Sequence, residues 1–239
     1  MHAITLRADL EVNMYYLIYF AIIVLIPIWA QMKVKNTFAK YSQVPTSSFR
    51  SGADVAREIL QANGLFNVGV EEGRGFLSDH YDPRSKTVRL SPENYHGHSI
   101  ASAAVAAHEC GHAIQDGEGY AFLRFRHILV PVANFGSNVS WVLIMIGILA
   151  HISGMLLIGI IFMAAAVLFQ IITLPVEFNA SNRAMDQVVA LGLIGNREER
   201  EARKVLNAAA LTYVAAAAVA VLELLRLVLI FTGMNRNDD

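Results

Sequence analysis

The chain alternates between polar segments and uncharged stretches that are long enough to cross a bilayer. Val12–Met32 carries no charge over 21 residues, and Ile128–Val176 contains no Asp, Glu, Lys or Arg over 49 residues. Because a helix crosses the hydrocarbon core with about 20 apolar residues, the first stretch predicts one span and the second predicts two. The turn between these two is expected at residues 151–154, which read His-Ile-Ser-Gly.

A fourth span is expected at Ala208–Thr232, an apolar stretch that contains one acidic and one basic residue. Glu223 and Arg226 are three positions apart, so they share one face of a helix and can pair with each other. In a membrane such a pair is expected to face neighbouring helices. We interpret it as a neutralised structural pair, and the alternative is a gate or a relay.

The segment between the first two spans has a different pattern. A helical periodicity at Ser51–Asn63 predicts an amphipathic helix, and residues 68–70 and 86–90 are candidate strands. The cluster Asp79–Ser85 between the strands predicts a turn. An extended edge strand here could hold a peptide by adding it as another strand. Polar helices are also expected between the third and fourth spans, at residues 177–186 and 196–204.

The composition agrees with a membrane protein. Of the 239 residues, 55% are hydrophobic and 16% are charged, and the mean hydropathy is +0.43. A soluble protein usually has about a quarter of its residues charged. The net charge of −1 gives no strong field for nucleic acid, so no such partner is expected. The single cysteine, Cys110, excludes an intrachain disulfide and a cysteine-rich zinc module.

The basic residues that flank the spans predict how the chain lies in the membrane. They concentrate in two loops, after the first span and between the third and fourth: Lys33, Lys35, Lys40, Arg183, Arg197, Arg200, Arg203 and Lys204. The positive-inside rule places both loops in the cytoplasm and both termini outside. The first span is expected to be retained rather than cleaved as a signal peptide, because acidic residues precede it and it lacks a small-residue cleavage site.

The candidate chemistry is a His-Glu-x-x-His pattern at residues 108–112. Ser99 is the expected N-cap of a helix, and the alanine-rich stretch that follows favours helix formation. Residues four apart lie on one helical face, so His108 and His112 can direct two imidazoles at one zinc ion. Glu109 then lies beside the metal, where it can accept a proton as the general base of peptide hydrolysis. The alternative is a chance motif on a buried helix.

A catalytic zinc needs three protein ligands and one open position. The metzincin pattern would place a histidine six residues after His112, where this chain has Glu118. Glu177 is the leading candidate for the third ligand, because it follows a predicted span on the same side of the membrane as the motif. Asp116 and Glu118 are alternatives, but the glycines at 117 and 119 predict that the motif helix ends near them.

Other residues near the motif have less specific interpretations. Three upstream histidines could bind metal or stabilise an oxyanion, or could simply lie at the surface: His80, His96 and His98. Cys110 occupies a variable position of the motif and is expected to pack rather than to bind metal. Gly111 costs about 1 kcal/mol relative to alanine inside a helix, which predicts a close approach of backbone or substrate there.

The motif segment His108–Gln115, with the upstream Asp79–Pro83 and the downstream Leu174–Ser181, resembles the YugP-like family of bacterial neutral zinc metallopeptidases. The resemblance extends from the first span to the fourth. It implies a multi-pass zinc peptidase of the bacterial inner (plasma) membrane, with one catalytic zinc ion.

The segment around Glu177 also resembles the Glu-x-x-Ala-Asp element of HtpX-type membrane proteases and CAAX prenyl proteases. In those families the Glu binds zinc, and the Asp four residues later supports a zinc-binding histidine. Ser181 occupies that Asp position here, and a hydroxyl does not supply the same charge. Asn179, Asn182 or Asp186 could take its place.

The fold class that we expect is mainly α and integral to the membrane, with about four transmembrane helices and a cytoplasmic α+β catalytic region of the zincin (gluzincin) type. The chain then divides into an N-terminal transmembrane anchor at 1–32, a catalytic region with the zinc helix at 33–127, a transmembrane hairpin at 128–176, cytoplasmic helices with the third ligand at 177–207, and a C-terminal transmembrane helix and tail at 208–239.

The expected activity is zinc-dependent hydrolysis of peptide bonds near the cytoplasmic membrane face. The alternatives are a quality-control or processing protease like HtpX or the CAAX proteases, and a non-catalytic, zinc-stabilised membrane scaffold. A structural zinc site has no need of a base, so Glu109 favours the enzyme. The expected partners are a peptide or membrane-protein substrate and the lipid bilayer, while oligomers and partner proteins stay open.

Overall fold

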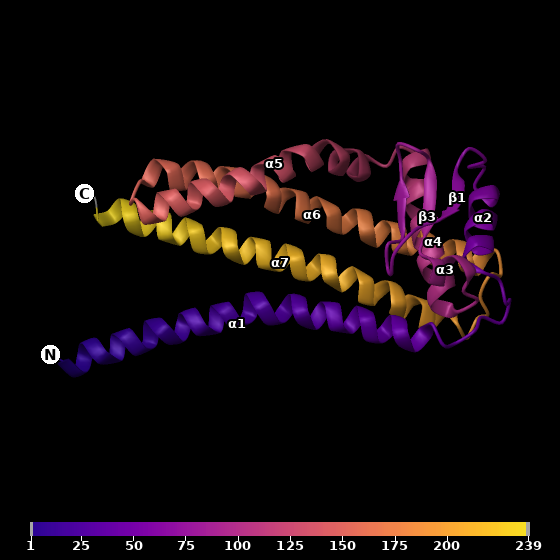
Figure 1. Cartoon of the computed structure of the whole chain (residues 1–239), viewed down its shortest axis with the longest axis horizontal. Coiled ribbons are helices and arrows are strands. Elements are labelled where there is room, and N and C mark those ends of the chain that lie inside the picture. The colour runs from indigo at the N-terminus through magenta and orange to yellow at the C-terminus, as the bar shows by residue number, and fades with distance from the viewer. Residues whose placement is uncertain (1, 238–239) are drawn as a thin grey trace.

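Long helices form an extended bundle that carries a compact region at one end (Figure 1). The computed structural model describes residues 2–237, and side chains are described from Met14 to Met234. The elements follow the chain in this order: α1 (His2–Tyr41), α2 (Gly52–Ala62), β1 (Gly69–Glu72), β2 (His80–Asp82), β3 (Thr87–Leu90), α3 (Pro92–His96), α4 (Ile100–Gly117), α5 (Ala121–Leu149), α6 (Ser153–Ala190) and α7 (Glu199–Asn237).

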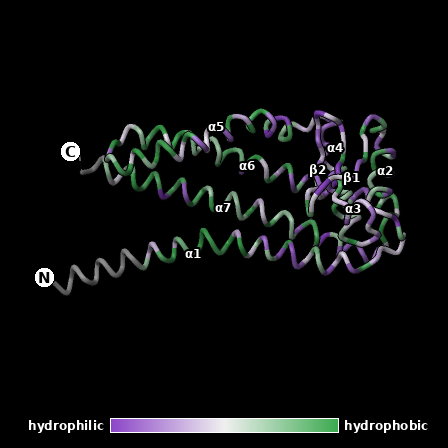
Figure 2. The backbone as a smooth tube through the Cα atoms, viewed as in Figure 1, coloured by the Kyte–Doolittle hydropathy of each residue, from purple (hydrophilic) through white to green (hydrophobic). Residues whose placement is uncertain are grey.

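Four helices, α1, α5, α6 and α7, are long and apolar enough to cross a membrane, as the sequence predicts. Figure 2 shows hydrophobic residues along these helices and hydrophilic residues concentrated in the compact region. Only 6% to 28% of the residues in the apolar part of each helix are buried inside the protein. Their apolar side chains therefore face outward, as contact with lipid requires. The two chain ends lie at the end of the bundle opposite the compact region (Figure 1).

The helices extend further than the predicted spans. α1 continues beyond the predicted span to Tyr41, because Phe38 and Tyr41 pack in the core of the compact region. α7 joins the predicted helix at 196–204 and the fourth span into one helix, because no Gly or Pro interrupts residues 199–232.

The compact region contains a three-stranded sheet with the strand order β1-β3-β2. β1 pairs in parallel with β3, and β2 pairs antiparallel with β3. β3 confirms the strand predicted at 86–90, and β1 begins one residue later than predicted. Among the described strands, β1 and β2 each have one unpaired edge.

The prediction of a turn over the whole of Asp79–Ser85 is wrong, because β2 occupies its middle. The turn is shorter and follows the strand. Asp82 closes it by accepting hydrogen bonds from the backbone N–H of Arg84 and from the hydroxyl of Ser85. The turn-forming residues follow directly after the strand, so the composition of the whole segment resembles that of a loop although its first part is a strand.

The motif helix α4 is the centre of the compact region and packs against α2, α6 and α7. The hydroxyl of Ser99 accepts the N–H of Ser102, which confirms the predicted N-cap. Cys110 is fully buried, as expected for a packing residue. The helix ends at Gly117, and Gly119 follows with a φ of +66°, a conformation that favours glycine.

The charged pair in the fourth span is present. Arg226 Nη2 lies 3.0 Å from Glu223 Oε2 within α7. The guanidinium also lies 5.1 Å from the ring centroid of Tyr19 on α1. The pair thus faces a neighbouring helix, which is the arrangement that the structural interpretation requires.

Candidate metal centre

Three potential metal ligands meet between α4 and α6. His108 and His112 come from α4, and Glu177 comes from α6. Glu177 Oε2 lies 3.3 Å from Nε2 of His108 and 3.5 Å from Nε2 of His112. One ligand atom of each residue lies within 4.8 Å of the other two. The structure therefore brings together the three residues that the sequence singles out as ligands.

The spacing and chemistry of these atoms fit a zinc ion. Two ligand atoms bound at about 2.0–2.1 Å to a tetrahedral zinc lie roughly 3.3 Å apart, close to the distances observed here. Glu177 Oε2 is buried and has no hydrogen-bond partner among the described residues. A buried oxygen without a partner is unfavourable, and a cation between it and the two imidazoles would satisfy it.

Each histidine has a partner on its other ring nitrogen. Nδ1 of His108 lies 3.2 Å from the hydroxyl of Ser181, and Nδ1 of His112 lies 3.0 Å from Oε1 of Gln115. An Nδ1–H that donates to these oxygens leaves Nε2 with a free lone pair, which is the tautomer that metal binding requires. Both partners are uncharged, so neither imidazole is backed by a carboxylate.

Gln115 and Asn179 connect the two helices behind His112. Gln115 is fully buried, and its Nε2 donates to the carbonyl of Val176 at 2.8 Å and to Oδ1 of Asn179 at 2.9 Å. The same oxygen of Asn179 accepts a hydrogen bond from Nε of Arg183 at 2.7 Å. Asn179 therefore reaches His112 through Gln115 rather than directly.

Two residues that the sequence analysis did not identify surround Glu177. Arg126 on α5 donates from Nη1 to Glu177 Oε1 at 3.0 Å, and Tyr213 on α7 lies near Glu177. A basic residue at the start of an apolar helix is usually an interfacial anchor, and a tyrosine within a span is unremarkable in composition. Their approach to Glu177 depends on how α5 and α7 pack against α6, for which the sequence carries no local signal.

The close approach of α4 and α6 depends on Gly111. A Cβ atom at this position would lie 2.4 Å from the backbone oxygen of Ala180, well inside van der Waals contact. The contact brings Glu177 and Ser181 within reach of the histidines. The close approach predicted from this glycine is therefore present, and it is made by a helix backbone.

Glu109 lies on α4 outside the ligand cluster. Its side chain is buried, and the backbone of Tyr81 in β2 lies beside it. Burial raises the pKa of Glu109 to about 7, with His108 acting in the opposite direction and the carboxylates of Glu177 and Asp79 adding to the rise. This carboxyl can gain and lose a proton near neutral pH, as a general acid–base group must.

The other candidate ligands lie outside the cluster of described residues. Each upstream histidine is exposed and uses a ring nitrogen elsewhere: His80 with the carbonyl of Ser78, His96 with Glu72, and His98 with the carbonyl of Phe49. The two alternative carboxylates form ion pairs: Asp116 with Lys86 at 2.6 Å, and Glu118 with Arg183 at 2.8 Å.

Known proteins resemble this chain over most of its length. Residues 16–232 match the model of a family described as "Putative neutral zinc metallopeptidase". A protein of Bacillus subtilis (strain 168) named "Putative membrane protease YugP" is 54% identical over 211 residues, which are 88% of this chain and 93% of that protein. No solved structure matches the chain. The matched segment includes both histidines of the motif and the carboxylate on α6.

Proposed function

Since this chain belongs to the family of neutral zinc metallopeptidases, we propose that it is a membrane endopeptidase that hydrolyses peptide bonds near the cytoplasmic membrane face. The observation that carries this proposal is the cluster of His108, His112 and Glu177 with a second buried carboxyl, Glu109, beside it. Three ligands leave one position of a tetrahedral zinc open, as a catalytic site requires.

In this proposal the site is of the gluzincin type, in which Nε2 of each histidine and Oε2 of Glu177 would hold one zinc ion. A zinc ion bound there supplies Lewis acidity that lowers the pKa of water and polarises the scissile carbonyl. Ser181 and Gln115 orient the imidazoles through Nδ1. Arg126 holds the second oxygen of Glu177, which favours one-oxygen ligation by that carboxylate.

Glu109 moves the proton. Its carboxylate accepts a proton from the water whose oxygen attacks the carbonyl carbon of the scissile bond. The protonated carboxyl then donates that proton to the departing amide nitrogen as the C–N bond breaks. Burial of Glu109 beside the backbone of Tyr81 limits how far its carboxyl can move during both transfers.

The strand β2 is the proposed docking edge for the substrate backbone. It lies at the edge of the sheet next to α4, and the backbone of its residue Tyr81 lies beside Glu109. An extended peptide that pairs with this edge would run past the catalytic carboxyl. Substrates of this kind are unfolded segments of membrane proteins that emerge at the membrane surface.

The test of the proposed function is a cleavage profile of a membrane-protein mixture exposed to the purified full-length protein. New peptide termini are expected with the zinc-loaded protein, and they should disappear when a chelator removes the metal and return when zinc is restored. Bound zinc without any zinc-dependent cleavage would contradict the peptidase and support the scaffold alternative.

The proposed orientation makes a separate prediction. Single cysteines introduced at Arg74 and Asn196 in a Cys110→Ser background should be protected from an impermeant thiol reagent in intact cells. A cysteine at Gly154, in the first turn of α6, should react, because the turn between α5 and α6 is expected outside. A Cβ at Gly154 meets no neighbouring atom, so the change itself is tolerated. Labelling at Arg74 with the membrane intact would place the metal centre on the outer side.

A further inference from the structure

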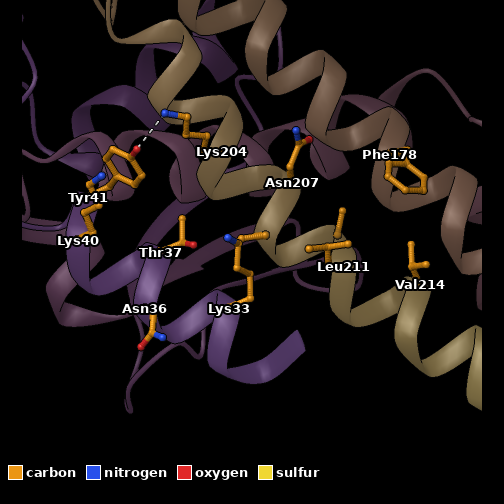
Figure 3. A pocket seen from close by; sticks show the side chains of 12 residues that line it. Lys33, Asn36, Thr37, Lys40, Tyr41, Phe178, Lys204, Asn207, Leu211 and Val214 are labelled. Atoms are coloured by element: carbon orange, nitrogen blue, oxygen red, sulfur yellow. Dashed lines mark hydrogen bonds between the residues drawn. The ribbon is translucent and has the colours of Figure 1, made fainter. Parts of the chain in front are cut away.

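A cavity of about 720 Å³ lies between α1 and α7, and neither histidine of the metal centre lines it. Its α1 wall is formed by residues spaced three or four apart, including Lys33, Thr37 and Lys40, and its α7 wall includes Lys204 and Leu211 (Figure 3). Such spacing places the residues of each wall on a single helical face. The cavity is therefore a groove bounded by two facing helix surfaces.

One end of this groove is strongly basic. Lys40 and Lys204 line this end, Lys33 lines the groove about 10 Å back along α1, and no Asp or Glu lines the groove. None of the three lysines takes part in an ion pair among the described side chains. Nζ of Lys204 lies 3.4 Å from the hydroxyl of Tyr41, and Nζ of Lys40 lies 5.1 Å from the Tyr41 ring centroid. The ammonium groups of Lys40 and Lys204 therefore lie around one phenol, and no carboxylate among the described side chains pairs with them.

The other end of the groove is apolar. Phe178 of α6 and Val214 of α7 line it, and Leu211 lies between them and the lysines (Figure 3). Val214 is ten residues beyond Lys204 on α7, which is about 15 Å along the helix. The groove thus changes from cationic to hydrocarbon-like over a length that suits an amphiphile with an anionic head.

The position of the groove in the membrane agrees with this polarity. The uncharged stretch of α1 ends at Met32, so Lys33 is the first charge beyond the apolar part of that helix. Lys40 follows seven residues later, about 10 Å further along the helix. These lysines lie where the phosphates of a bilayer leaflet are expected, and the apolar end points back toward the hydrocarbon core.

We propose that this groove binds an anionic phospholipid, with its phosphate beside Lys40 and Lys204, Lys33 at the border with the apolar end, and part of an acyl chain along Phe178, Leu211 and Val214. Asn36 and Asn207 also line the groove and can donate hydrogen bonds to headgroup oxygens. The inference does not depend on the peptidase assignment, because the binding itself is measured.

The experiment uses the full-length protein in detergent and counts bound phosphatidylglycerol and phosphatidylcholine by native mass spectrometry. The variant Lys33→Gln/Lys40→Gln/Lys204→Gln removes the three groove charges. Its matched control, Lys35→Gln/Arg200→Gln/Arg203→Gln, removes three charges from the same two helices at exposed positions that do not line the groove. The groove variant should bind phosphatidylglycerol at least roughly tenfold more weakly than wild type, since each basic residue near an anionic surface contributes severalfold.

The control variant should retain wild-type phosphatidylglycerol binding, and phosphatidylcholine should bind wild type more weakly than phosphatidylglycerol. Equal losses in the two variants would show only diffuse attraction to basic residues and would overturn the site. Displacement of the lipid by inorganic phosphate at equal concentration would also overturn it, because the apolar end of the groove would then contribute nothing.

Discussion

Glu109→Gln is expected to lower peptide hydrolysis by at least about 100-fold while the protein keeps its zinc. The amide has nearly the volume of the carboxyl, so the buried position stays filled. It has no basic oxygen that can take a proton from water. The three ligand atoms come from other residues, so metal binding should not change.

The measurement is the cleavage rate on one verified substrate, together with zinc content by elemental analysis. Glu118→Gln is the matched control, because it makes the same chemical change at an exposed glutamate whose partner is Arg183. The control should cleave at nearly the wild-type rate. A Glu109→Gln protein that cleaves normally would contradict the general-base role, and one that has lost its zinc would assign Glu109 to the metal instead.

The parts of this protein that local physics determines could be predicted from the sequence. The four apolar helices follow from residue hydropathy, and the cap at Ser99 and the end of α4 near Gly117 follow from local backbone chemistry. The pairing of His108 with His112 on one face requires only that the segment is helical. Each of these features depends on residues a few positions apart.

Features that depend on how helices cross were harder to predict from the sequence. Glu177 could be nominated, because a carboxylate directly after an apolar stretch needs a partner, but Arg126 could not be recognised as one of its partners. That contact joins residues 51 positions apart on two helices whose crossing is set by packing along both. Gly111 was the one local signal of such a crossing, and it showed neither the direction nor the partner.

The support of the histidines is the clearest example. The comparison of motifs showed that Ser181 does not supply the charge of the Asp found in related proteases, and it left Asn179, Asn182 or Asp186 as possible replacements. In the structure Ser181 itself contacts His108, and His112 is supported by Gln115, a residue three positions along its own helix. That second contact was available from the sequence, since residues three apart share a helical face.

Glu177→Ala and Glu177→Gln are expected to lower zinc affinity by more than about 100-fold. Loss of a residue that only hydrogen-bonds to a metal ligand costs about 10–100-fold, and these variants change a ligand itself. Oε2 of Glu177 is the atom that faces both imidazoles, and it has no other partner among the described residues. Alanine removes both oxygens, and the amide replaces a charged ligand with a neutral one. Two imidazoles alone do not complete a catalytic zinc site.

The alanine variant also leaves Arg126 without its carboxylate partner in a partly buried position, which could destabilise the fold by itself. Glu177→Gln separates the two effects, because its amide oxygen can still accept the hydrogen bond from Arg126. Both variants are therefore compared for thermal unfolding of the metal-free protein as well as for zinc content. A well-folded Glu177→Gln protein with little zinc is the expected result.

Three further variants are expected to lower zinc affinity less than the Glu177 variants do. Ser181→Ala removes a partner of His108 and should weaken zinc binding by about 10-fold. Asp116→Ala and Glu118→Ala should leave zinc content close to wild type, because their carboxylates pair with Lys86 and Arg183 instead. Zinc content is measured by elemental analysis after dialysis against a weak chelator. Full zinc occupancy in the Glu177→Ala protein would show that Glu177 is not a ligand. Its role would then be to anchor α6 at the membrane interface, which does not require metal.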